Sequence, residues 1–164
     1  MTVLLRDFRE SDHDCIWQIR ADTELQHLLM ANPDPDRIVD VKAWVARRQE
    51  QGHLKVISND TEEPLGFGQI HSQHFKNQHA WLGIALHPDA QGKGLGKKSM
   101  QLLHDYARRS LGLRKLMLEV RRDNHPAIKL YDALNYVRVG DFKKHYFDGE
   151  HYHDVLVMER MLVE

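Results

Sequence analysis

The sequence has only one cysteine, Cys15, in 164 residues. No intrachain disulfide can form, so the chain does not resemble small disulfide-stabilised secreted domains, and we expect it in a reducing cytoplasm. It also has no apolar run of about 18 residues, the length that a membrane helix needs. The opening stretch MTVLLRDFRE is charged from Arg6 onward. We therefore expect neither a membrane span nor a signal peptide.

An excess of charge of one sign is also missing. The chain has 23 Lys and Arg against 24 Asp and Glu, a formal net charge of −1. Nothing in this balance favours bulk binding to nucleic acid or to an anionic membrane, so we expect neither partner. Hydrophobic residues make up 41% and charged residues 29%, which is ordinary for a globular protein. The length predicts one domain, residues 1–164, with a full core.

Histidine, in contrast, is abundant, with 12 copies. His151 and His153 would share one face of a strand, and His71 and His74 would share one face of a helix. Neither pair has a third ligand at a spacing typical of metal sites. We therefore expect no metal.

Hydrophobic periodicity and turn residues divide the chain into strands and helices. The order is strand 2–8, helix 11–29, the proline-rich break NPDPD at 32–36, helix 38–52, strands 53–58, 65–72 and 79–87, helix 95–110, strand 115–120, helix 125–136, and strands 137–147 and 151–161. Residues 79–87, HAWLGIALH, form a nearly continuous apolar run that suits a central strand. This order predicts an α/β (α+β) fold with about seven strands and about four helices.

Residues 87–98, HPDAQGKGLGKK, place three glycines at alternate positions between a buried strand and a helix. Such a stretch is either a flexible surface loop or a backbone cradle for phosphate at a helix start. The P-loop pattern fails because Lys97 stands where its last glycine belongs, and the dinucleotide fingerprint fails at the same residue. The pattern Q/R-x-x-G-x-G/A does fit, from Gln91 to Gly96.

That pattern resembles the signature of the GNAT N-acetyltransferase superfamily. A second segment, LEVRRDNHPAIKLYDALNYV at 118–137, is similar to the family's strand, asparagine and tyrosine-bearing helix. The resemblance spans essentially the whole chain and is nearest to the ribosomal-protein alanine and nucleotide-amino-sugar branches. It implies a single GNAT-like domain with a mixed, mostly antiparallel sheet, and acetyl-CoA as co-substrate.

The resemblance also implies a set of acetyl-CoA contacts. Backbone amides of the glycine loop would wrap the pyrophosphate, backbone groups of the central strand would pair with pantetheine, and Asn124 would hydrogen-bond pantetheine. The alternatives are solvated lysines, plain core packing and a helix N-cap, respectively. The implied residues are Ile84, Ala85, Leu86, Gln91, Gly92, Lys93, Gly94, Leu95, Gly96, Lys97 and Asn124.

Two residues match catalytic positions of the family. Tyr131 corresponds to the tyrosine that protonates the departing CoA thiolate; the alternative is a core aromatic beside Ala127 and Leu134. Glu119 corresponds to the glutamate base of the ribosomal-protein branch, which takes a proton from the amine, if ordered water does not. The alternative for Glu119 is an ion pair with a neighbouring cation of its own strand.

The acceptor follows less directly from the sequence. In the family it binds between the first helices and the last hairpin. We expect a small primary amine, such as a nucleotide-linked amino sugar; the alternatives are a protein N-terminus, a polyamine, or a non-catalytic CoA-sensing domain. A homodimer is possible. The alternative for the residues of both regions is an ordinary solvated face. The candidate contacts are Asp22, Glu24, Asp34 and Asp36 in the first region and Tyr146, Phe147 and Tyr152 in the second.

Overall fold

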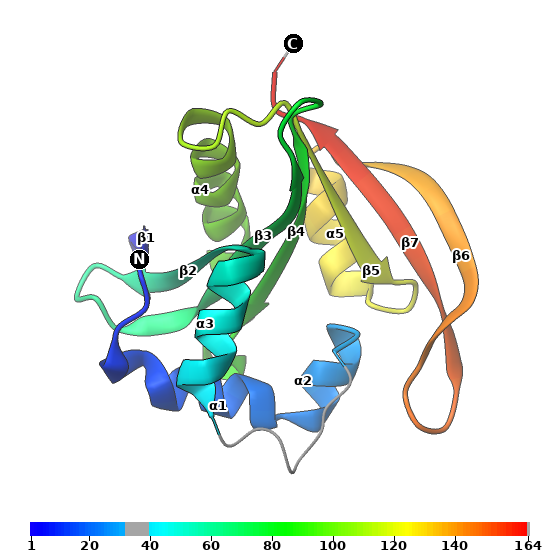
Figure 1. Cartoon of the computed structure of the whole chain (residues 1–164). Helices are drawn as coiled ribbons and strands as arrows, with labels where there is room; N and C mark the ends of the chain where they lie inside the picture. The colour runs from blue at the N-terminus through cyan, green and yellow to red at the C-terminus, as the bar shows by residue number, and fades with distance from the viewer. Residues whose placement is uncertain (32–39, 164) are drawn as a thin grey trace.

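A seven-stranded sheet forms the centre of the protein in a computed structural model that describes residues 1–31 and 40–163. Its strand order is β1-β2-β3-β4-β5-β7-β6, with β1 at one edge and β6 at the other (Figure 1). The strands are β1 (Val3–Arg6), β2 (Gly52–Asn59), β3 (Pro64–His74), β4 (His79–Leu86), β5 (Lys115–Arg121), β6 (Val137–Phe147) and β7 (Tyr152–Met161).

Most neighbouring strands run antiparallel, and β4 and β5 are the parallel pair. This pair is parallel because a helix crosses over between the two strands, whereas hairpins join β2, β3 and β4 and also β6 and β7. The expectation of a mixed, mostly antiparallel sheet in an α/β fold is confirmed.

The described residues form five α-helices where about four were expected. They are α1 (His13–Ala21), α2 (Thr23–Leu28), α3 (Val41–Gln51), α4 (Leu95–Arg109) and α5 (His125–Ala133), with short 3-10 helices η1 (Glu10–Asp12) and η3 (Pro88–Ala90). The extra helix arises because the expected helix 11–29 breaks at Asp22. This residue is extended, with φ −75° and ψ 98°, and its side chain accepts a hydrogen bond from the Leu25 backbone at 3.0 Å. Asp22 therefore ends α1 and caps α2.

The helices cover both faces of the sheet. On one face, α4 and α5 bury apolar residues such as Met100, Leu103 and Ile128 against β5 and β7. On the other face, α1 and α3 pack residues such as Ile16 and Val45 against β2 and β3. Figure 1 shows α3 in front of the sheet and α5 behind it. The expected break at 32–36 lies outside the described residues.

A buried ion pair fixes the start of the chain. The Asp12 carboxylate accepts two hydrogen bonds from the Arg6 guanidinium at 2.8 Å and one from the Arg9 backbone N–H at 2.8 Å. Burial raises the pKa of Asp12, but the hydrogen bonds from Arg6 and Arg9 outweigh that effect and hold it below its usual value. The pair ties β1 to η1, which leads into α1.

Candidate active site

The parallel strands β4 and β5 separate along their length. They pair only from His79 to Trp81 on β4 and from Lys115 to Met117 on β5. Beyond these residues β4 continues beside β3 and β5 continues beside β7. Figure 1 shows the two strands diverging, with α5 behind the opening and α2 near its wide end. Among the described residues, the second half of β4 therefore has a backbone edge without a sheet partner.

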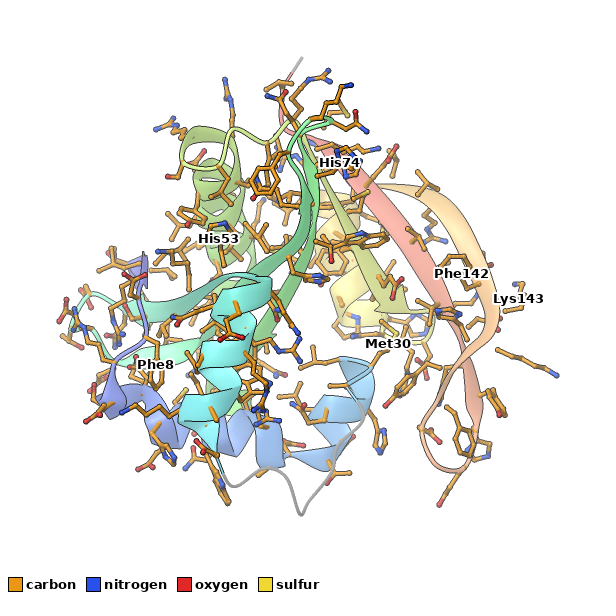
Figure 2. The ribbon with its side chains drawn as sticks, in the orientation of Figure 1. Phe8, Met30, His53, His74, Phe142 and Lys143 are labelled. Atoms are coloured by element: carbon orange, nitrogen blue, oxygen red, sulfur yellow. The ribbon has the colours of Figure 1, made fainter. Side chains whose placement is uncertain are left out.

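A cavity of about 840 Å³ occupies this opening. The part of the chain that follows α2 contributes Met30, which Figure 2 labels at the wide end of the opening. The residues that line it are Arg20, Gln26, Leu28, Leu29, Met30, Ala31, Trp44, Arg47, Arg48, Phe67, Gln69, His71, Ser72, Trp81, Leu82, Gly83, Ile84, Ala85, Glu119, Val120, Asn124 and Tyr131. Of the residues expected from the sequence, Ile84, Ala85, Glu119, Asn124 and Tyr131 meet here.

Tyr131 lies on α5 and is 9% exposed. Its ring packs against that of Tyr136, with 5.7 Å between the ring centres. Burial raises the pKa of Tyr131 to about 12, so the phenol carries its proton throughout the neutral range. The residue belongs to the core and also lines the cavity, so both interpretations of its position fit the structure.

Glu119 lies in the middle of β5, is exposed, and lines the cavity. The two cations that were its alternative partners pair elsewhere. Lys115 contacts Glu159 at 2.9 Å, and Arg121 contacts Asp123 at 2.7 Å. Among the described residues no ion pair involves Glu119, which argues against a purely structural salt bridge.

Asn124 precedes α5 and also lines the cavity. Its side-chain oxygen accepts a hydrogen bond from the Ala127 backbone N–H at 3.4 Å, so the residue is a helix N-cap. The cap uses only the side-chain oxygen, so the amide N–H groups of Asn124 can donate to a ligand. A capping role and a ligand contact are therefore compatible.

The glycine loop joins β4 to α4 and lies outside the cavity lining. Gly92 and Gly94 have φ of +72° and +75°, and a Cβ atom at either position would meet nothing within 4 Å. Gly94 is the N-cap of α4, so the first backbone N–H groups of the helix follow it directly. Gln91 holds the loop to the end of β4 by donating to the Leu86 carbonyl at 3.1 Å. The loop is thus an open backbone concavity at a helix start.

Four residues of the loop and of the first turn of α4 have surroundings of their own. Gly96 lies inside α4, where an added Cβ would come within 3.3 Å of Leu130, so its small size serves helix packing. Leu95 is buried in the core, so its backbone alone is available to a ligand. Lys93 and Lys97 are exposed.

Of the acidic and aromatic residues expected at the acceptor site, those that the structure describes do not line the cavity. Asp34 and Asp36 lie outside the described residues, and Asp22 caps α2. Glu24 is exposed, and Tyr146 is hydrogen-bonded to His27 at 2.8 Å. Phe147 and Tyr152 are exposed and lie against each other, with 4.8 Å between their ring centres.

Sequence reasoning missed a group of basic residues on the cavity wall, namely Arg20, Arg47 and Arg48. One signal was present, because Arg48 falls in the helical repeat of apolar residues that includes Trp44. An arginine on an apolar helix face points inward and needs a partner or a stacking surface there.

Other chemistries find little support in the geometry. Burial raises the pKa of the Cys15 thiol to about 11, with a smaller contribution from Asp12, so it is no activated nucleophile. Among residues 1–31 and 40–163, no group of three or more His, Cys, Asp or Glu is placed to hold a metal ion. No helix within those same residues is long and apolar enough to cross a membrane.

Comparison with known proteins identifies the family. The model of the Acetyltransferase (GNAT) family matches residues 5–136. The N-acetyltransferase p20 of Bacillus licheniformis is 25% identical over 148 residues, which cover 85% of this chain and 83% of that protein. The spermidine N(1)-acetyltransferase of Escherichia coli (strain K12) is 27% identical over 109 residues, 66% of this chain and 59% of that enzyme.

The fold has a counterpart among solved structures. A crystal structure of spermidine N-acetyltransferase from Vibrio cholerae in complex with CoA and spermine matches with a TM-score of 0.89 and 20% identity, over 98% of this chain and 95% of that chain. This likeness shows the fold. With the family match, it establishes that the chain belongs to the Acetyltransferase (GNAT) family. The prediction of an acetyl-CoA-dependent N-acetyltransferase is confirmed at that level.

Proposed function

We propose that this chain transfers the acetyl group of acetyl-CoA to a small primary amine by direct attack, with residues 1–164 acting as one N-acetyltransferase domain. The observation that carries the proposal is the cavity between the separated strands β4 and β5, which brings Glu119 and Tyr131 together. Attack without an acyl-enzyme needs both reactants in one cavity, and the half-buried thiol of Cys15, with its raised pKa, offers no alternative nucleophile.

Features of the backbone fit acetyl-CoA. The positive φ of Gly92 and Gly94 and the empty space beside them allow the loop to approach a pyrophosphate, and the N-terminal end of α4 attracts its charge. The edge of β4 that faces away from β3 has no partner strand at Ile84, Ala85 and Leu86 within the described part of the chain, so an extended pantetheine arm can pair with it as a strand would. Bound there, acetyl-CoA supplies the acetyl group and a thiolate leaving group.

Glu119 and Tyr131 divide the proton transfers between them. An alkyl ammonium has a pKa near 10.4 and must lose a proton before attack, and Glu119 accepts it directly or through water. Tyr131 keeps its proton at neutral pH because its pKa is about 12, and it donates that proton toward the thiolate. Asn124 remains the proposed contact to the amide groups of pantetheine.

The relatives bear on the acceptor. Spermidine acetyltransferases occur among both the sequence relatives and the structural neighbours. Of the acceptors considered from the sequence, they favour a polyamine over a nucleotide-linked amino sugar, which gains no support from these comparisons. A polyamine is therefore a second candidate for the acceptor within this function. The charge of the cavity wall bears on the choice of acceptor independently of the relatives.

The test is release of free thiol from acetyl-CoA across a panel of amines. The panel contains spermidine, a nucleotide-linked amino sugar, a peptide with a free N-terminus, and small amino acids together with the amines that lack their carboxylate. We expect thiol release that depends on both substrates for at least one small amine. Binding of acetyl-CoA without turnover of any amine would instead support the non-catalytic CoA-sensing alternative.

The outer edge of the sheet supports the expectation of a homodimer. β6 is an edge strand with exposed apolar side chains, among them Val137, Val139 and Phe142. Figure 2 labels Phe142 and Lys143 on β6, with Lys143 at the outer side of the strand. Because an edge strand can pair with its own copy, we propose a dimer through β6. Sedimentation equilibrium tests it, and a Phe142→Glu variant should then be monomeric.

A further inference from the structure

One wall of the cavity concentrates positive charge. Arg20 of α1 and Arg47 and Arg48 of α3 line it, and among the described residues no carboxylate forms an ion pair with any of them. The guanidinium carbons of Arg20 and Arg48 lie 4.7 and 5.3 Å from the centre of the Trp44 ring. The indole holds both cations in place on the cavity side of α3.

This arrangement is unfavourable without a ligand of opposite charge. Burial lowers the pKa of Arg20, and the charges of Arg48 and Arg47 lower it further; burial and Arg47 do the same to Arg48. Arginine remains protonated in proteins, so the wall keeps its positive charge. Burial and Arg48 also lower the pKa of the nearby His71. Like charges gathered in a half-buried place favour the binding of an anion.

The wall also presents hydrogen-bond donors that lack partners. Arg20 Nη1 and Gln69 Nε2 are buried and have no hydrogen-bond partner among the described residues. Both residues line the cavity, Arg20 from α1 and Gln69 from β3. Buried donors in native proteins are nearly always satisfied, so two in one cavity indicate a ligand that accepts hydrogen bonds.

We infer that the acceptor amine also carries an anionic group, a carboxylate or a phosphate, which Arg20, Arg47 and Arg48 bind. The inference rests on the proposed function and names its substrate class. Arginine binds both groups in a forked geometry through paired N–H donors. Glu119 lines the same cavity from β5 and faces the ammonium end, so the cavity is complementary to a molecule with both charges. Spermidine is a polycation without an anionic group, and the arginines would repel it.

Matched amines test the inference. Lysine and cadaverine differ by a carboxylate, and phosphoethanolamine and ethanolamine differ by a phosphate. Thiol release is measured for each at saturating acetyl-CoA, with spermidine alongside. We expect kcat/KM to be at least about tenfold higher for the anionic member of at least one pair, since hydrogen bonds to charged groups contribute that much. The pair with the larger ratio identifies the carboxylate or the phosphate.

Variants locate the effect on the arginines. In Arg48→Gln, KM for the anionic amine should rise about 10–100-fold with little change in kcat, and the matched amine without the anionic group should lose no activity. Arg47→Glu, at an exposed position, should weaken use of the anionic amine and improve use of cadaverine. Arg109→Gln, which removes one exposed arginine of α4 outside the cavity, is the matched control and should change neither.

Failure of the inference and failure of the proposed function give different results. Equal kcat/KM within both pairs, or spermidine as the best acceptor, overturns the anion site and leaves acetyl transfer standing. Calorimetric titration of the same amines detects the opposite case, in which the proposed function fails and the anion site stands. If no amine is acetylated but the anionic amine binds wild type more tightly than Arg48→Gln, the proposed function is wrong and the anion site stands.

Discussion

Replacement of Tyr131 by phenylalanine tests the proposed acid with little disturbance of the fold. The substitution removes one hydroxyl and keeps the ring that packs against Tyr136 at 5.7 Å between centres. Burial alone raises the pKa of Tyr131, and no hydrogen bond contributes to the shift. The free energy of unfolding should therefore change by less than about 1 kcal/mol, and calorimetry should give wild-type affinity for acetyl-CoA.

Turnover should fall steeply in Tyr131→Phe. Proton donation in the transition state contributes about 10²–10⁴-fold, which corresponds to about 3–5 kcal/mol of the barrier. Because the pKa of Tyr131 is about 12, the phenol does not titrate between about pH 6 and 10. The pH profiles of kcat for wild type and variant should then have the same shape and differ in height.

Tyr136→Phe is the matched control. This neighbouring tyrosine is buried, does not line the cavity, and has its hydroxyl hydrogen-bonded to His104 Nε2 at 2.8 Å. Loss of that bond should lower the free energy of unfolding by about 1–3 kcal/mol and leave turnover unchanged. If Tyr131→Phe turns over normally at saturating substrates, the hydroxyl is no acid and Tyr131 is a core aromatic only.

Three further changes test other parts of the molecule. Gly94→Asp should weaken acetyl-CoA binding about tenfold or more by placing a negative charge at the pyrophosphate. Gly112→Asp, at φ +65° with equally open surroundings, is the control and should leave that affinity unchanged. If calorimetry shows the same loss of acetyl-CoA affinity in both variants, backbone strain is the cause. Glu119→Gln should lower kcat most at low pH and recover part of it as the amine deprotonates, and a uniform loss across the pH profile would exclude a base. Asp12→Ala should lower the free energy of unfolding by about 3–5 kcal/mol in urea, because it leaves Arg6 buried and unpaired. Since the pKa of Asp12 is lowered in the folded state, this difference should be present above about pH 4 and shrink as the pH falls further; an unchanged difference at acid pH would contradict that origin.

The sequence predicted the parts of the fold that local patterns control. The nearly continuous apolar run at 79–87 specifies the strand β4 without reference to distant residues. The break at Asp22 was missed because one aspartate can lie within a helix or cap the next one, and the sequence pattern allows both. The glycine loop was found because a positive φ at Gly92 and Gly94 requires a residue type that the sequence displays directly.

Local patterns do not predict the cavity wall of Arg20, Arg47 and Arg48, because folding brings these residues together from α1 and α3. We propose that this wall binds the acceptor. Counting charges in the first helical region suggested an acidic site, yet the Asp22 carboxylate is used as a helix cap and Arg20, two positions earlier, lines the cavity beside Arg48 of α3. The proposed acetyl-CoA site depends mainly on backbone geometry, namely the open glycine loop before α4 and the separated strands β4 and β5. The acceptor side depends on a few side chains of α1 and α3 that can change while the fold stays the same. A spermidine acetyltransferase can therefore match the fold at 20% identity and differ at this wall, so matched amines decide the acceptor where further structural likeness does not.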